Sequence, residues 1–147
     1  MKKWMIFFVI MFISARAEAN VSNEMAAEIM GIAREHITQA KLQDGSFVPA
    51  ETEEEMKHLI IPIEDAKRVI HFGSKSGLAE WCGIEYRPAY LQFMQDERRL
   101  GKWNDKQIAY IGLLHGISVS VFSHSLQKTQ GLCSEAQKRH MLEQLTE

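Results

Sequence analysis

QIAYIGLLHGISVSVFSHSL, residues 107–126, is the stretch that decides the fold. At 100° per residue, its large apolar side chains spread around the whole circumference of a helix instead of gathering on one side. A helix that is apolar all round is buried either within a bundle or in a membrane. The stretch also contains two histidines and four serines, which favour the central helix of a bundle.

Further helices are predicted on both sides of this stretch, because apolar residues recur there three or four positions apart. We expect these helices over residues 23–42, 63–81, 88–100 and 135–145. Asn104 and Ser134 are each followed three residues later by a glutamine, which is the capping-box pattern that opens a helix. The sequence therefore predicts an all-α protein, folded as a compact bundle of four to five helices.

Residues 44–62 show the weakest pattern in the chain. Thr52 and Glu55 have capping-box spacing, which predicts a short helix there. The acidic run Glu51, Glu53, Glu54 and Glu55 raises the possibility of a metal site. Such a run more often marks a solvated helix start, where the helix dipole favours negative charge. We therefore predict no metal site and no cofactor.

The first nineteen residues have the three parts of a secretory signal peptide. Lys2 and Lys3 precede the apolar run 4–13, and Ala17 and Ala19 permit cleavage after Ala19. Since a membrane-spanning helix needs about 20 apolar residues, the run is too short to favour the alternative, an uncleaved anchor. We expect a signal peptide over 1–19 and a single helical domain over 20–147, exported to a bacterial periplasm or to the extracellular space.

The charge of the exported chain is unremarkable. Removal of residues 1–19 would leave 14 lysines and arginines against 18 aspartates and glutamates, a net charge of −4. This balance argues against broad binding to nucleic acids or anionic membranes. We expect no nucleic-acid partner, and no membrane span once the signal is removed.

Cys82 and Cys133 are the two cysteines of the chain. In a small exported domain, an even number of cysteines predicts a disulfide. The sequence lacks the C-x-x-C pattern of redox and haem-attachment sites, and two thiols are too few for a structural zinc. We therefore predict one disulfide, Cys82–Cys133.

His115 is the leading candidate for a functional side chain, since it interrupts the apolar stripe of the central helix. A buried histidine needs a hydrogen-bond partner, and it is more often a structural core residue than a ligand-binding or proton-transferring group. The ligand-binding hypothesis places it with four further residues: Glu80, Trp81, Tyr86 and Tyr90. No motif assigns a catalytic residue.

Small residues spaced four apart predict close helix packing. Gly73 and Gly77 lie on one predicted helix, and Gly112, Gly116 and Ser120 lie on another. Missing side chains allow two helix backbones to approach closely. We expect these two faces to meet, directly or across an aromatic side chain, so that Gly116→Leu would destabilise the fold by about 1–3 kcal/mol. Alternatively, Gly112 and Gly116 border a ligand cavity.

Two functions are compatible with the sequence. The first is a non-enzymatic interaction, accessory or chaperone-like domain that binds a protein or a small apolar ligand. The alternative is a small-ligand-binding protein or enzyme with its site inside the bundle around His115. A concave pocket that includes His115 would favour the alternative, and a solid core around a hydrogen-bonded His115 would favour the first.

Overall fold

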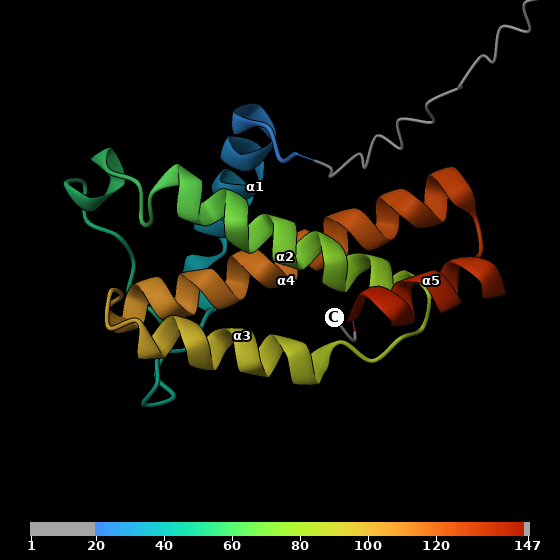
Figure 1. Ribbon diagram of the computed structural model, residues 1–147. Coiled ribbons are helices and arrows are strands. Elements are labelled where there is room, and N and C mark those ends of the chain that lie inside the picture. The colour runs from blue at the N-terminus through green and yellow to red at the C-terminus, as the bar shows by residue number, and fades with distance from the viewer. Residues whose placement is uncertain (1–19, 146–147) are drawn as a thin grey trace, which may run out of the picture.

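The computed structural model describes residues 20–145, and the predicted signal peptide over residues 1–19 lies outside this range. Five α-helices follow one another (Figure 1): α1 (Asn23–Glu35), α2 (Ile63–Trp81), α3 (Arg87–Arg99), α4 (Asp105–Gln130) and α5 (Glu135–Leu145). Two short 3-10 turns, η1 (Ile37–Gln39) and η2 (Glu55–Lys57), lie between α1 and α2. Within the described residues the pairing of Lys41 with Phe47 is an isolated bridge and no strand is formed. The predicted all-α bundle of four to five helices is confirmed.

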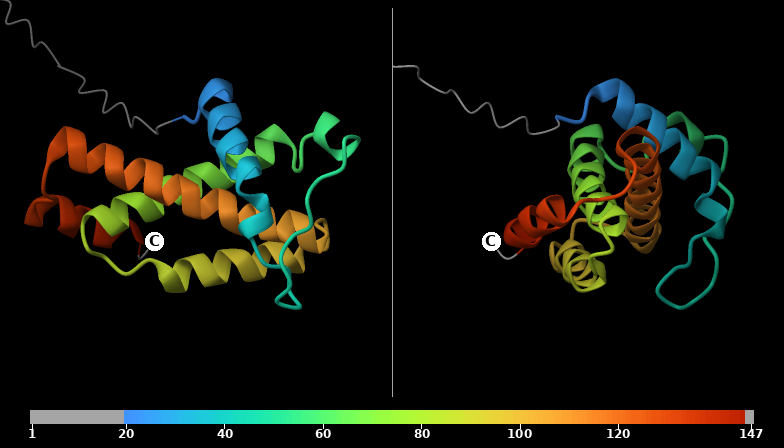
Figure 2. Two further views of the ribbon diagram at one scale, coloured as in Figure 1. Left: turned by 180° about the vertical axis from the view of Figure 1, so that it is seen from behind. Right: turned by 90° about the vertical axis from the view of Figure 1, so that its right-hand side faces the viewer.

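The helices α2 and α4 run side by side in the same direction and form the centre of the bundle (Figure 1). The helix α3 returns antiparallel to both of them, and α1 crosses α2 and α4 steeply on the other side (Figure 2). The last helix, α5, packs on the end of α2, and its Gln137 donates a hydrogen bond of 3.3 Å to Gln130 at the end of α4. The core therefore lies where α1, α2 and α4 meet.

Tyr110 links α4 to α1 within this core. Its side chain is 1% exposed, and its hydroxyl donates a hydrogen bond of 2.9 Å to the carbonyl oxygen of Met30 in α1. Burial raises the pKa of Tyr110 and keeps the phenol neutral. Ile111 and Leu114 on the same side of α4 are fully buried.

The predicted helix over residues 23–42 is too long. It begins as expected, with Ser22 as N-cap accepting a hydrogen bond from the amide of Met25. It ends at Glu35, because η1 tightens the chain and Ala40 then adopts an extended conformation. A turn around Gly45, whose φ of 85° suits glycine, brings Phe47 back beside Lys41.

The capping boxes expected from sequence are all formed. Asn104 with Gln107, Ser134 with Gln137, and Thr52 with Glu55 each make both reciprocal hydrogen bonds. The first two open α4 and α5, and the third forms a turn over residues 52–55 that leads into η2, whose N-cap is Glu54. Local sequence therefore sets the starts of α4 and α5 correctly.

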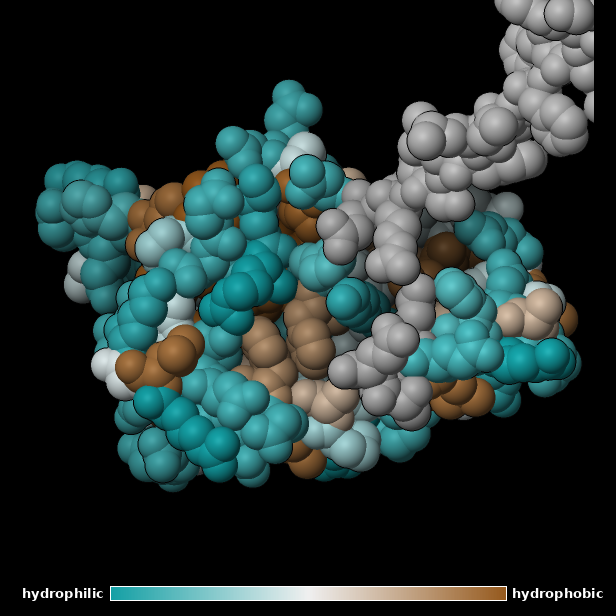
Figure 3. All heavy atoms as spheres, in the orientation of Figure 1, coloured by the Kyte–Doolittle hydropathy of each residue, from teal (hydrophilic) through white to brown (hydrophobic). Residues whose placement is uncertain are grey.

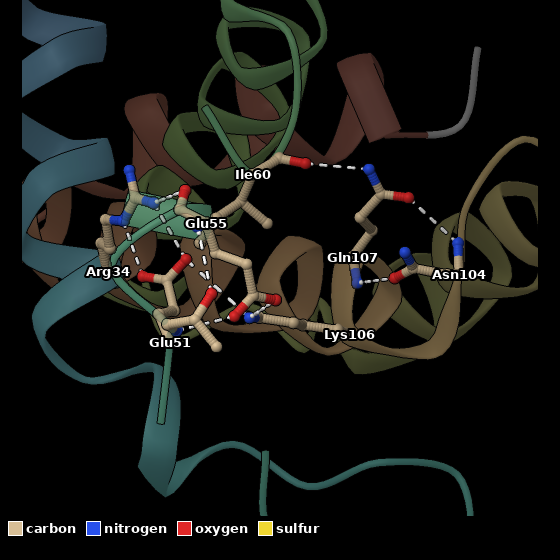
Figure 4. A network of polar contacts seen from close by, with 8 residues as sticks. Arg34, Glu51, Glu55, Ile60, Asn104, Lys106 and Gln107 are labelled. Carbon is tan, nitrogen blue, oxygen red and sulfur yellow. Dashed lines mark hydrogen bonds and ion pairs between the residues drawn. The ribbon is translucent and has the colours of Figure 1, made fainter. Parts of the chain in front are cut away.

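The acidic run of residues 51–55 anchors the segment between α1 and α2 (Figure 4). Arg34 of α1 binds both carboxylate oxygens of Glu51, at 2.7 and 2.9 Å. Lys106 of α4 binds Glu55 at 2.8 Å, and this contact together with hydrogen bonds from Thr52 lowers the pKa of Glu55 to about 2. No group of three potential metal ligands occurs in the part of the chain that the structure describes.

Gly73 and Gly77 bring α2 into direct contact with the backbone of α4. A Cβ on Gly77 would lie 2.9 Å from the carbonyl oxygen of Val119, and one on Gly73 would lie 2.5 Å from the Cβ of Ser118. Neither position has room for a side chain. We call this contact of Gly73 and Gly77 with His115, Ser118, Val119 and Phe122 the seam.

The prediction that Gly112, Gly116 and Ser120 form the α4 side of this contact is wrong. A Cβ on Gly116 would meet nothing within 4 Å, and Ser120 is exposed. Gly112 faces α3 instead, where a Cβ would lie 3.1 Å from the hydroxyl of Tyr90. The seam uses the residues between these small ones, because α4 is rotated so that Ser118 and Val119 point at α2.

The disulfide Cys82–Cys133 is present, with 5.0 Å between the two Cα atoms. It joins the C-cap of α2 to the link that precedes α5. Disulfides persist in oxidising compartments, so the bond is a weak indication of an exported environment.

The helix α4 is the one described helix that is long and apolar enough to cross a membrane, judged by length and composition alone. In this structure it is the central helix of the bundle. Its buried side carries Tyr110, Leu114 and Ser118, while Gly116, Ser120 and Val121 are exposed. We call these last three residues the outer face of α4.

Candidate functional site

A groove of about 520 Å³ lies beside the first half of α4. Its walls are α3, α4 and the extended segment after η1, which passes alongside α4 and reaches the level of α3 (Figure 2, left). The lining residues are Ala40, Lys41, Leu42, Gln43, Tyr90, Met94, Arg98, Trp103, Asp105, Ile108, Ala109, Gly112 and Leu113. A cavity of this size falls in the range of small-molecule sites.

Local structure explains why the segment after η1 can form a wall. The amide of Leu42 donates to the carbonyl oxygen of Ser46 at 2.8 Å, and the amide of Gly45 donates back to Leu42 at 3.0 Å. The amide of Val48, which is 2% exposed, donates to Ala40 at 3.0 Å. The backbone of this turn is thus hydrogen-bonded to itself, and Val48 holds it against the core.

Tyr90 joins the groove to the core of the bundle. One side of its ring stacks on His115, with 4.5 Å between the ring centres, while its hydroxyl lies beside Gly112. Burial raises the pKa of Tyr90, although the nearby Arg98 lowers it in part. The phenol is therefore a neutral hydrogen-bond donor, and it has no hydrogen-bond partner among the described residues.

The groove also contains three charged side chains. Lys41 and Arg98 line it, and neither forms an ion pair with any carboxylate that the structure describes. Arg98 Nη1 donates only to the carbonyl oxygen of Met94 at 3.5 Å, and Lys41 lies 5.5 Å from the ring centre of Phe47. Asp105, in the first turn of α4, is the one acidic lining residue.

Trp103 lines the groove, and a hydrogen bond fixes its indole ring. Its indole nitrogen donates to Glu97 at 2.9 Å, and Arg68 donates to both oxygens of the same carboxylate. Glu97 is 3% exposed. Burial raises its pKa, but the hydrogen bonds from Arg68 and Trp103 outweigh this and hold it below the usual value. Glu97 is thus an ionised buried group that positions Trp103.

His115 lies in the core rather than in a cavity. It is 2% exposed, its Nε2 lies 3.0 Å from the hydroxyl of Ser76, and it lines neither the groove beside α3 nor the groove near the disulfide. Burial lowers its pKa to about 4, so the imidazole is neutral at pH 7. The rings packed around it are Phe72, Tyr86, Tyr90 and Phe93.

The five residues proposed as a ligand site from sequence do not form one site. Tyr86 and Tyr90 contact His115, whereas no hydrogen bond or ring contact in the described region joins Glu80 or Trp81 to it. Trp81 instead donates to the carbonyl oxygen of Gly131 at 2.7 Å beside the disulfide. Glu80 and Trp81 line a second groove of about 350 Å³ at that end of the molecule.

Sequence reasoning missed Lys41, Arg98 and Trp103. A signal for Arg98 was available, because Tyr90, Met94 and Arg98 are each four residues apart and so share one face of α3. In the sequence, however, Arg98 stands in a run of four charged residues, 96–99, which is also the pattern of a solvated helix end. For Lys41 no signal existed, since the predicted first helix would have placed it on a helix rather than in an extended wall.

Comparison of the chain with protein-family models, curated proteins and solved structures gave no match. The class that the fold defines is a disulfide-linked all-helical bundle. Its larger groove contains no serine, cysteine or histidine that could act with a base as a nucleophile. The groove combines apolar side chains, one phenol and three charged side chains without ion-pair partners among the described residues.

Proposed function

We propose that the protein is an exported, non-enzymatic binding domain that holds a small apolar ligand in the groove between α3, α4 and the segment after η1. The groove itself carries the proposal. Leu42, Met94, Ile108 and Leu113 supply apolar walls, and the volume of about 520 Å³ suits a small molecule. A few polar groups at defined positions would orient the ligand.

Export is part of the proposal. The signal-like residues 1–19 and the disulfide together support a mature chain that begins at Asn20 and acts in a periplasm or outside the cell. N-terminal sequencing of the exported protein tests this. A chain that retains Met1 in a membrane fraction would contradict it.

The alternative, a site within the bundle around His115, has less support. His115 packs against aromatic rings and is hydrogen-bonded to Ser76, and it lines neither the groove beside α3 nor the groove near the disulfide. Among the rings around His115, Tyr90 also lines the groove and so belongs to both.

The test is native mass spectrometry of protein purified from its own compartment, with Gly112→Leu compared to Gly116→Leu. Both changes add the same side chain to α4, but Gly112 lines the groove and Gly116 faces open space. We expect a bound small molecule in the wild type and in Gly116→Leu, and its loss in Gly112→Leu. An empty wild-type protein, or a ligand retained in Gly112→Leu, would contradict the proposal.

A further inference from the structure

Deepening the proposed function, on which this inference rests, we propose that the ligand of the groove is a carboxylate with an apolar body. Arg98 and the hydroxyl of Tyr90 would bind the carboxylate, and the apolar body would lie along Ile108, Leu113 and Trp103.

The polar end of the groove is built on one face of α3. Tyr90, Met94 and Arg98 follow one another at one-turn intervals, and all three line the groove. The hydrogen bond from Arg98 Nη1 to the carbonyl oxygen of Met94 turns the guanidinium back along α3, toward Tyr90. Burial raises the pKa of Tyr90, and the positive charge of Arg98 offsets part of this effect.

Both groups lack a stronger partner in the described structure. Arg34, Arg68 and Arg99 each bind a carboxylate, whereas Arg98, which is exposed at the mouth of the groove, shares with Arg87 and Arg139 the lack of an ion pair among the described residues. Arg98 has only a long bond to its own helix, and the hydroxyl of Tyr90 has none. A guanidinium and a phenol are both donors, so an acceptor with two oxygens, such as a carboxylate, satisfies them together.

Charge favours an anion over a cation. The lining charges are Lys41, Arg98 and Asp105, which sum to one net positive charge. Gln43 is the remaining polar side chain of the lining and can accept or donate. The volume of the groove suits a small molecule better than a folded protein surface, so we assign a free amphiphilic carboxylate as the occupant.

The absent side chain at Gly112 is part of this site. A Cβ there would lie 3.1 Å from the hydroxyl of Tyr90 and 3.6 Å from the terminal methyl of Met94. Glycine therefore keeps the space next to the phenol open on the side of α4, where a carboxylate oxygen must approach.

The experiment uses the exported chain with Trp81→Phe, which leaves Trp103 in the groove as its tryptophan reporter. Dodecanoate, dodecanol and dodecyltrimethylammonium are titrated below their micelle concentrations, and Trp103 fluorescence is followed alongside calorimetry. We expect dodecanoate to bind at least ten-fold more tightly than dodecanol and the cation to bind most weakly.

Arg98→Gln should reduce the affinity for dodecanoate to that for dodecanol, and Tyr90→Phe should reduce it by about three-fold. Arg99→Gln is the matched control, because Arg99 is exposed, pairs with Asp96 at 3.3 Å and does not line the groove. It should leave the affinity unchanged. A thermal melt of each variant checks that the fold is retained.

The outcomes separate the inference from the function on which it rests. Equal binding of dodecanoate and dodecanol, or equal losses in Arg98→Gln and Arg99→Gln, would overturn the carboxylate assignment while leaving an apolar groove. Absence of binding by all three probes, or heat of binding without a change at Trp103, would overturn the groove as the binding site as well.

Discussion

The two sides of α4 show how one sequence pattern can produce two environments. On the seam, Gly77 of α2 touches the backbone of α4 so closely that no Cβ fits. On the outer face, Gly116 of α4 has nothing within 4 Å of its Cβ position. Both glycines sit inside a helix, four residues after another glycine. The spacing shows that a ridge of side chains is missing, but only the fold shows what fills the space.

The apolar residues on the molecular surface also lie in separate places. On the face seen in Figure 3, hydrophobic residues form separate patches among hydrophilic ones rather than one continuous area. The most exposed large apolar side chains are also scattered over several segments: Phe47, Leu59, Leu100 and Leu132. Scattered exposure of this kind is ordinary for a protein surface.

Removal of the disulfide should have the largest effect, because both sides of α4 lie within the loop that it closes. The two cysteines are 51 residues apart, for which the chain-entropy estimate gives about 4 kcal/mol. Chemical denaturation of Cys82→Ala/Cys133→Ala should show this loss in a single transition. An unchanged denaturation midpoint would mean that the disulfide holds only α5 in place and does not stabilise the rest of the bundle.

Acid should weaken the seam through His115. The unfolded chain takes up this proton near pH 6.5 and the folded protein only near about 4. Between these values the unfolded state binds more protons, so stability falls as the pH falls. At roughly 1.4 kcal/mol for each pKa unit, the total loss is about 3 kcal/mol.

The measurement is the free energy of unfolding from pH 7 to 4 for the wild type and His115→Gln. Glutamine can still hydrogen-bond Ser76 but takes up no proton, so the variant should lose less stability over this range. Other titrating groups are common to both proteins and cancel in the comparison. Parallel curves for the two proteins would contradict a buried neutral His115.

The free energies of unfolding of Gly77→Leu and Gly116→Leu should differ by about 2 kcal/mol. Gly77→Leu would push the side chain into the backbone at Val119 and cost about 2–3 kcal/mol. Gly116→Leu enters open space and should be nearly neutral, which reverses the expectation drawn from the sequence. Denaturant midpoints for both variants test this, and an equal loss would contradict the assignment of the seam.

Helices were predictable where the signal is local. The capping boxes at Asn104 and Ser134 and the spacing over 63–81 gave the correct helix type and close boundaries, and two cysteines allowed one pairing. The end of α1 was not predictable in this way. Residues 37–42 keep a helical apolar pattern, but they are not helical. Ile37 packs in the core from the 3-10 turn η1, and Ala40 packs against the core from the extended segment that follows.

The candidate site was mostly hidden from the sequence because its walls come from segments far apart in the chain. Tyr90 was identified, but as a neighbour of His115 rather than as part of a groove. Lys41, from the extended segment after η1, and Trp103, from the link between α3 and α4, line the same groove as Tyr90. Such placement depends on tertiary packing, which periodicity within one helix does not encode.

The most direct test of this account is the change in melting temperature for Gly77→Ala and Gly116→Ala. Alanine favours a helix interior by about 1 kcal/mol over glycine at both positions, so propensity alone predicts two equal gains. The structure predicts opposite signs: a lower melting temperature for Gly77→Ala, where the methyl meets backbone at 2.9 Å, and an unchanged or higher one for Gly116→Ala. Shifts of the same sign and size in both variants would contradict the division of α4 into a seam and an outer face.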